Sequence, residues 1–166
     1  MRIIKRLPGI GMEKDNERVS AVFTVYDPET DSFRYVLRQA CEKGLKAHGH
    51  KPNDTYFGFP GSNGYTGETP EQTAVRTAKQ WGFDVHPKRH FADEDTEAEV
   101  TRHYVFSDCD NDKKLVVPDN LVISYSDPLT EQERRMIFLT ARQLVDSDNV
   151  LDNAKQIVRF WDYKSL

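Results

Sequence analysis

Apolar residues recur every three or four positions in one stretch near the middle of the chain, which is typical of a helix with one buried face. The predicted apolar stripe consists of Ala74, Val75, Ala78 and Trp81. Thr69 and Gln72 have the spacing of a capping box, and Pro70 suits the first helical position. Gly82 supplies a C-terminal stop. The pattern therefore predicts a helix that begins at Pro70 and ends before Gly82.

Runs of β-branched and aromatic residues on both sides of this helix predict strands. Before it, residues 19–26 and 33–38 form two such runs around the turn 27–31, which predicts a hairpin. Residues 40–56 are polar and predict a long loop. After the central helix, strands are predicted at residues 83–90, 100–107, 115–117 and 121–125.

Two further helices are predicted at the C-terminal end. Thr130 and Glu133 have capping-box spacing and begin the first, and the second begins near Asp148 or Asn149. The two predicted stripes are Met136, Ile137, Thr140, Ala141, Leu144 and Val145, and then Val150, Leu151, Ala154, Ile157, Val158 and Trp161. Strands around a central helix, followed by helices, predict an α+β fold, an α/β/α sandwich with a mixed sheet flanked by helices.

The composition predicts a single domain that spans residues 1–166. With 37% hydrophobic residues, 30% charged residues and a net charge of −4, the chain has no general attraction to nucleic acid or to anionic membranes. The sequence shows neither a signal peptide nor an apolar run long enough to span a bilayer. Cys41 and Cys109 have no metal-binding spacing. These features predict a protein of the reducing cytoplasm.

Glycine is dense in the ten residues before the central helix, at Gly58, Gly61, Gly64 and Gly67. This density predicts a loop with positive φ angles or a close approach to a ligand. Together, residues 61–83 resemble a Nudix box, the loop–helix–loop whose family pattern is G-x5-E-x7-R-E-U-x-E-E-x-G-U, where U is apolar. The resemblance lies in residues 59–61, in the helix start 67–71, and in Glu68 and Arg76, which are separated by seven residues. It implies a Nudix fold that holds Mg²⁺ against a substrate diphosphate.

The second half of the family pattern is missing from this chain. When the pattern is aligned from Arg76, its three glutamates fall on Thr77, Gln80 and Trp81. When it is aligned backwards from Gly82 and Phe83, they fall on Arg76, Lys79 and Gln80, so neither alignment finds a carboxylate. Ser62 also replaces the first glycine of the box. Because Mg²⁺ requires several oxygen ligands, the loss predicts a domain that binds a nucleoside diphosphate-type ligand with weak or no hydrolysis.

Three alternatives remain open at this point. The first is an active Mg²⁺-dependent pyrophosphohydrolase that uses other carboxylates. The second is a protein–protein interaction module, which would bind a protein partner or form a homodimer. The third alternative is an ordinary amphipathic helix behind a glycine loop, with no relation to nucleotides.

The resemblance and the loop composition together give a set of candidate site residues. The catalytic candidates are Glu68, Glu71 and Arg76. The metal candidates, for Mg²⁺, are Glu68, Glu71, Glu97 and Glu99. The ligand-binding candidates are Gly61, Gly67, Lys43, Lys51 and Tyr65. Base stacking is assigned to Tyr56, Phe57 and Tyr65, and ordinary core packing is the alternative for Phe57.

Several of these candidates have a simpler interpretation. Glu97 and Glu99 belong to the acidic run 92–99, which also suits a solvated hairpin turn. Lys43 and Lys51 belong to the polar loop 40–56, and lysines commonly keep a loop solvated. His48 and His50 in the same loop have no third metal ligand nearby. His103 lies in the predicted strand 100–107 and is predicted to be a structural side chain rather than a catalytic one.

Overall fold

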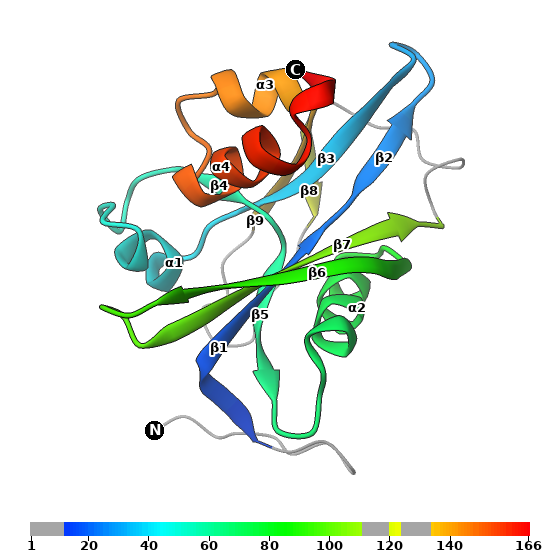
Figure 1. The fold of residues 1–166 in the computed structure, drawn as a ribbon. Helices are drawn as coiled ribbons and strands as arrows, with labels where there is room; N and C mark the ends of the chain where they lie inside the picture. The colour runs from blue at the N-terminus through cyan, green and yellow to red at the C-terminus, as the bar shows by residue number, and fades with distance from the viewer. Residues whose placement is uncertain (1–11, 111–119, 124–133) are drawn as a thin grey trace. The chain divides into compact units, whose positions relative to one another are not determined.

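The computed structural model describes residues 12–110, 120–123 and 134–166, which divide into two compact units (Figure 1). Unit 1 consists of Met1–Phe23 and Pro60–Asn111, and unit 2 of Thr24–Phe59 and Asp112–Leu166. The chain therefore passes from one unit to the other at residues 23/24, 59/60 and 111/112. Neither unit is a continuous stretch of sequence.

Unit 1 contains a mixed four-stranded sheet. Its strand order is β5 (Gly61–Tyr65), β1 (Glu13–Val22), β7 (Val100–Cys109) and β6 (Val85–Asp95). β1 and β7 run parallel, and the other neighbours run antiparallel. Helix α2 (Pro70–Gln80) contacts all four strands. The core of the unit is formed by the alanines of α2 together with apolar side chains of the sheet and of the segment after the helix. These side chains include Val19, Ala21, Trp81, Phe83, Tyr104 and Val105.

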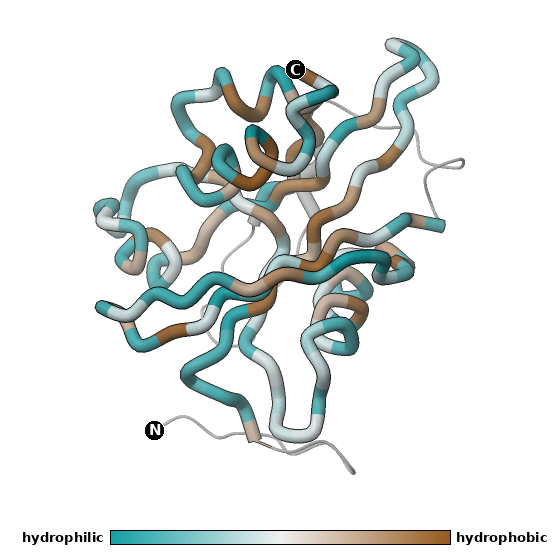
Figure 2. The backbone as a smooth tube through the Cα atoms, viewed as in Figure 1, coloured by the Kyte–Doolittle hydropathy of each residue, from teal (hydrophilic) through white to brown (hydrophobic). Residues whose placement is uncertain are grey.

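The strand β6 lies at one end of this order and is exposed over most of its length. It is also hydrophilic along most of its course (Figure 2). β6 extends to Asp95, so the acidic run 92–99 is half strand and half turn rather than the predicted turn alone. Charged side chains along an edge strand discourage pairing with another chain, which accounts for the carboxylates at this edge.

Unit 2 contains a five-stranded sheet whose described strands pair antiparallel, and an isolated parallel bridge joins Phe57 to Val150. β2 (Thr24–Asp27), β3 (Ser32–Gln39), β9 (Arg134–Leu139) and β8 (Asn120–Ile123) follow one another, and β4 (Phe57–Gly58) pairs with β3. The other elements are α1 (Glu42–Ala47), α3 (Ala141–Asp146), α4 (Asp152–Trp161) and the 3₁₀ turn Tyr163–Ser165. Helices α3 and α4 pack together, and α3 contacts β3 and β9. Strands with flanking helices confirm the predicted α+β class.

The predicted hairpin around the turn 27–31 is confirmed, but its first strand is not continuous. Val22 pairs with Phe106 of β7, whereas Thr24 pairs with Tyr35 of β3. The predicted strand 19–26 is thus two strands interrupted at Phe23. A β-branched run has the same propensity whichever neighbour it pairs with, so the pattern does not show where the partner changes.

The predicted loop 40–56 contains a helix, α1, and this part of the prediction is wrong. Cys41 caps the helix, because its sulfur accepts a hydrogen bond from the Gly44 N–H at 3.4 Å. Leu45 is the one buried residue of α1. A six-residue helix with one buried side chain and an internal glycine has no periodicity that a sequence pattern can detect.

The C-terminal helices begin later than predicted. Met136 and Ile137 belong to strand β9, and α3 begins at Ala141 with Thr140 and Gln143 as its capping box. Val150 and Leu151 are buried ahead of α4, and Trp161 at its end is 38% exposed. The run at residues 136–138 is fully apolar, and such a short run is compatible with either a strand or a helix.

Some predicted features lie outside the described residues, namely Thr130, Glu133 and the strand 115–117. Among the helices that the structure describes, none combines the length and the apolar character needed to cross a membrane.

Candidate functional site

Helix α2 begins where the sequence predicts, because its capping residues are all in place. The Thr69 hydroxyl accepts a hydrogen bond from the Gln72 N–H at 3.2 Å, and the Gln72 side chain accepts one from the Thr69 N–H at 2.9 Å. Pro70 is the first helical residue. Gly82, which follows the C-cap, has a φ of 90°, a value that favours glycine. Local capping chemistry thus defines both ends of the helix.

The buried face of α2 is more polar than predicted. It consists of Thr73, Ala74, Thr77 and Ala78. Trp81 is buried as predicted, but Val75 is 36% exposed, so its assignment to the stripe is wrong. Thr77 is tolerated in the core because its hydroxyl forms a hydrogen bond of 2.9 Å with the Ser62 hydroxyl.

The carboxylate of Glu68 is held by three neighbours within the loop–helix segment. Its Oε2 accepts a hydrogen bond from Arg76 Nε at 2.9 Å. Its Oε1 accepts from the Tyr65 N–H at 3.0 Å, from the Thr73 hydroxyl at 3.0 Å and from Arg76 Nη2 at 3.1 Å. Burial raises the pKa of Glu68, but the hydrogen bonds from Arg76 and the Tyr65 N–H outweigh it, so the pKa lies below its ordinary value.

Arg76 connects this carboxylate to strand β5. Its Nη2 donates to the Asn63 carbonyl oxygen at 3.0 Å, and its guanidinium lies 4.2 Å from the centre of the Tyr65 ring. Asn63 in turn donates to Glu13 of β1 at 2.6 Å. The Glu68–Arg76 pair therefore ties the loop before α2 to the sheet.

Glu68 precedes the N-cap, so of the two predicted carboxylates only Glu71 stands on the first turn of the helix.

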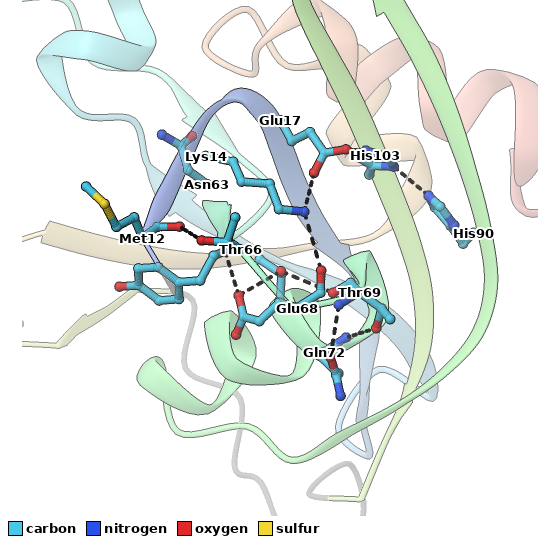
Figure 3. A network of polar contacts seen from close by, with 12 residues as sticks. Met12, Lys14, Glu17, Asn63, Thr66, Glu68, Thr69, Gln72, His90 and His103 are labelled. Atoms are coloured by element: carbon cyan, nitrogen blue, oxygen red, sulfur yellow. Dashed lines mark hydrogen bonds and ion pairs between the residues drawn. The ribbon is translucent and has the colours of Figure 1, made fainter. Parts of the chain in front are cut away.

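A second set of polar side chains extends from Glu71 across the sheet, and we call it the polar row: Glu71, His90, His103, Glu17 and Lys14. Its contacts run in that order, with Glu71 Oε1 3.3 Å from His90 Nδ1, His90 Nε2 2.7 Å from His103 Nδ1, and His103 Nε2 3.4 Å from Glu17 Oε1. Lys14 Nζ lies 2.7 Å from Glu17 Oε2 and 3.5 Å from the Glu68 carbonyl oxygen. Figure 3 shows Lys14, Glu17, His103 and His90 in this sequence.

The polar row places the buried imidazole of His103 between the imidazole of His90 and the carboxylate of Glu17. The hydrogen bond from Lys14 is the main cause of the lowered pKa of Glu17. Burial lowers the pKa of His103, and the neighbouring carboxylate of Glu17 only partly opposes it. This row could not be predicted from the sequence, because His90 and His103 are thirteen residues apart and meet only through the strand register.

The predicted ligand residues of unit 1 lie in or beside strand β5. Gly61 begins the strand, where an added Cβ would lie 3.2 Å from the Val19 carbonyl oxygen. Gly67 has a φ of 90°, as the glycine density predicts. Tyr65 ends the strand and has Arg76 over its ring. Tyr65 and Glu68 come together before the start of α2, whereas Gly61 lies at the other end of β5, next to Ser62, whose hydroxyl contacts Thr77 in the second half of the helix.

Glu97 and Glu99 are exposed in the turn that follows β6. His90, the β6 residue that contacts Glu71, lies five residues before Asp95, which corresponds to about 17 Å along a strand. Within the described ranges, no group of three or more His, Cys, Asp or Glu side chains is arranged to hold a metal ion. The structure thus does not gather the four predicted metal ligands, and the residues present do not fit a resident Mg²⁺ site.

The remaining candidates belong to unit 2. Lys43 is exposed on α1, and Lys51 is exposed in the turn after it, where its N–H donates to Asp54. The ring of His50 stacks on Tyr56, with centroids 3.8 Å apart. Phe57 is 4% exposed, in agreement with the core-packing alternative.

Comparison with known proteins rests on structure alone. No protein-family model matches the chain, and no curated protein sequence matches it significantly. Among solved structures, a mutT/nudix family protein from Listeria innocua has a TM-score of 0.56 and 12% identity, and the match covers 91% of this chain and 94% of that one. The E. coli ORF135 protein has a TM-score of 0.52 and 13% identity, with 93% and 96% covered.

A further similarity joins the chain to Shewanella oneidensis NrtR, with a TM-score of 0.50, 14% identity, and 90% of this chain and 64% of that one covered. At these identities the likeness concerns the fold. Together with the capped loop–helix and the Glu68–Arg76 pair, the comparisons show that this chain has the Nudix fold.

Proposed function

We propose that the protein binds a nucleoside diphosphate-type ligand at the loop–helix segment and hydrolyses it weakly or not at all. The observation that carries this proposal is the commitment of the Glu68 carboxylate to Arg76, Tyr65 and Thr73. Both of its oxygens already accept hydrogen bonds, and an Arg-paired carboxylate is a poor candidate for coordinating Mg²⁺.

The rest of α2 supports weak turnover as well. Aligned from Arg76, the family's glutamates correspond to Thr77, which is buried against Ser62, to Gln80, and to Trp81, which is 6% exposed. None of these side chains replaces a carboxylate cluster that positions metal and water. Glu71 is therefore the one acid within the helix, and its charge repels a bare phosphate at this end. Binding is accordingly expected to be weak.

The proposal is tested by a chemical-shift titration with ADP-ribose up to millimolar concentration, with and without Mg²⁺, together with an assay for monophosphate release. We expect shifts in residues 61–76 and little or no release. Vigorous Mg²⁺-dependent release would favour an active pyrophosphohydrolase instead. An absence of shifts in this segment would remove the binding proposal and favour a protein-interaction module.

Two glycines provide a matched pair of variants for the same titration. Gly67 and Gly82 both have a φ of 90°, and an added Cβ meets nothing within 4 Å at either position. Replacing either glycine with alanine therefore strains the backbone to a similar extent. Gly67→Ala should weaken ADP-ribose binding because Gly67 borders the ligand loop, whereas Gly82→Ala, at the far end of α2, should not. Equal effects of the two variants would contradict the assigned location.

A further inference from the structure

His90 and His103 are diagonal neighbours on one face of the β6–β7 hairpin. His90 pairs with Val105, and His103 pairs with Ala92, two residues further along β6. Side chains two residues apart on a strand share a face, so the two imidazoles point to the same side. Their ring centroids are 4.9 Å apart, and Nε2 of His90 lies 2.7 Å from Nδ1 of His103 (Figure 3).

The outer nitrogen of each ring faces a carboxylate. Nδ1 of His90 lies 3.3 Å from Glu71 Oε1, and Nε2 of His103 lies 3.4 Å from Glu17 Oε1. Both contacts are ion-pair distances, and Nε2 of His103 is buried without a hydrogen-bond partner among the described residues. Because the negative charge of a carboxylate favours a proton on the nitrogen that faces it, the N–H of each ring is best placed on its outer nitrogen. A neutral imidazole has a single N–H. With both N–H groups on the outer nitrogens, the two inner nitrogens present lone pairs to each other, and either a shared proton or a metal ion between them removes the repulsion.

We propose that His90 Nε2 and His103 Nδ1 together bind a divalent transition metal of the zinc class, with water in the remaining positions. Zn²⁺–nitrogen bonds are about 2.0–2.1 Å long, which at a tetrahedral angle places the two nitrogens roughly 3.3 Å apart. The present separation of 2.7 Å suits a shared proton, which the metal displaces on binding. The two nitrogens need to move apart by about 0.6 Å, and the rings need to turn so that both lone pairs point to the metal.

The surroundings of the pair suit this exchange. His103 is held in the sheet with 9% of its side chain exposed, whereas 26% of the His90 side chain on the edge strand is exposed. The metal therefore has access from solvent on the His90 side, and that ring can adjust. The outer carboxylates would fix the tautomer and orientation of each ring, as carboxylates commonly do for metal-binding histidines. Imidazole nitrogens select zinc-class ions over Mg²⁺, so the site differs in kind from the one that the family resemblance implies.

The test is an isothermal titration of the intact chain with ZnCl₂ at neutral pH, with MgCl₂ as the control metal and NMR spectra of the histidine ring protons recorded in parallel. We expect one Zn²⁺ per chain, shifts of the His90 and His103 ring protons, and no response to Mg²⁺. His90→Ala should abolish the Zn²⁺ binding. His86→Ala is the matched control, because it also removes a β6 histidine, one that pairs with Asp110.

A separate variant tests the role of the outer carboxylates. Glu17→Gln should weaken Zn²⁺ binding about 10-fold or more, the usual effect of changing a group that orients a ligating histidine. His90 and Glu17 are used because His103 is buried and its loss could unfold the chain; circular dichroism spectra check that each variant is folded. Zn²⁺ binding that persists in His90→Ala, or unmoved His90 and His103 signals at millimolar Zn²⁺, would overturn the proposal and leave the pair with a shared proton only.

Discussion

Individual residues of the loop–helix segment hold one another in place through hydrogen bonds and an ion pair. Glu68 is the clearest case, since its two oxygens accept hydrogen bonds from Arg76, Thr73 and the Tyr65 N–H. The side chains of Glu68 and Arg76 are 11% and 20% exposed, so the pair is screened from solvent much more than a surface ion pair. We infer that its principal contribution is to the stability of the loop–helix segment.

Replacing the guanidinium tests that role. Arg76→Met leaves a largely buried carboxylate without its cation and should lower the free energy of unfolding by about 3 kcal/mol at pH 7. Urea denaturation measures the change. Lys79→Met is the control, because Lys79 and Asp84 form an exposed pair, 75% and 58% exposed, that should contribute at most about 1 kcal/mol. Equal losses in the two variants would contradict the structural role.

The same pair predicts a pH dependence with a definite sign. Because the pKa of Glu68 is lower in the folded state, its stabilisation is fully present above the unfolded pKa of about 4.3. That stabilisation is lost as the pH falls through the folded-state pKa. The difference in unfolding free energy between wild type and Arg76→Met should therefore shrink below about pH 4.

Single elements differ in how much of them the sequence reveals. The boundaries of α2 follow from side chains at its own ends, Thr69, Gln72 and Gly82, so they are predictable without knowledge of the fold. The identity of β9 is not, because residues 136–138 become a strand through pairing with β3 and β8. The contact between His90 and His103 likewise depends on the register of β6 against β7. Local chemistry is visible in a sequence, whereas pairing partners are not.

The packing of α2 can be tested through its last buried side chain. Trp81→Ala removes a large aromatic that is 6% exposed and should destabilise the fold by about 3–5 kcal/mol. Val75→Ala, on the same helix but 36% exposed, should change stability by less than about 1 kcal/mol. Denaturant midpoints of the two variants measure the difference. Comparable midpoints would mean that the assigned face of the helix is wrong.

At the scale of the molecule, the sequence predicts one domain, while the contacts define two compact units. Each unit is assembled from two separate segments, because the chain changes unit at residues 23/24, 59/60 and 111/112. A unit of this kind cannot complete its sheet until both of its segments are in place. In unit 1, β1 pairs with β7 across more than seventy residues, and in unit 2, β3 pairs with β9 across about a hundred. We therefore expect the chain to unfold as a single cooperative domain.

The two tryptophans of the chain make this expectation measurable, because Trp81 belongs to unit 1 and Trp161 to unit 2. Trp161→Phe leaves Trp81 as the reporter of unit 1, and Trp81→Phe leaves Trp161 as the reporter of unit 2. In each variant, urea unfolding followed by tryptophan fluorescence should coincide with unfolding followed by far-ultraviolet circular dichroism, which reports on both units. Comparison within each variant removes the effect of the substitution on overall stability. If fluorescence and circular dichroism gave separate midpoints in either variant, the units would unfold independently and the single-domain prediction would be wrong.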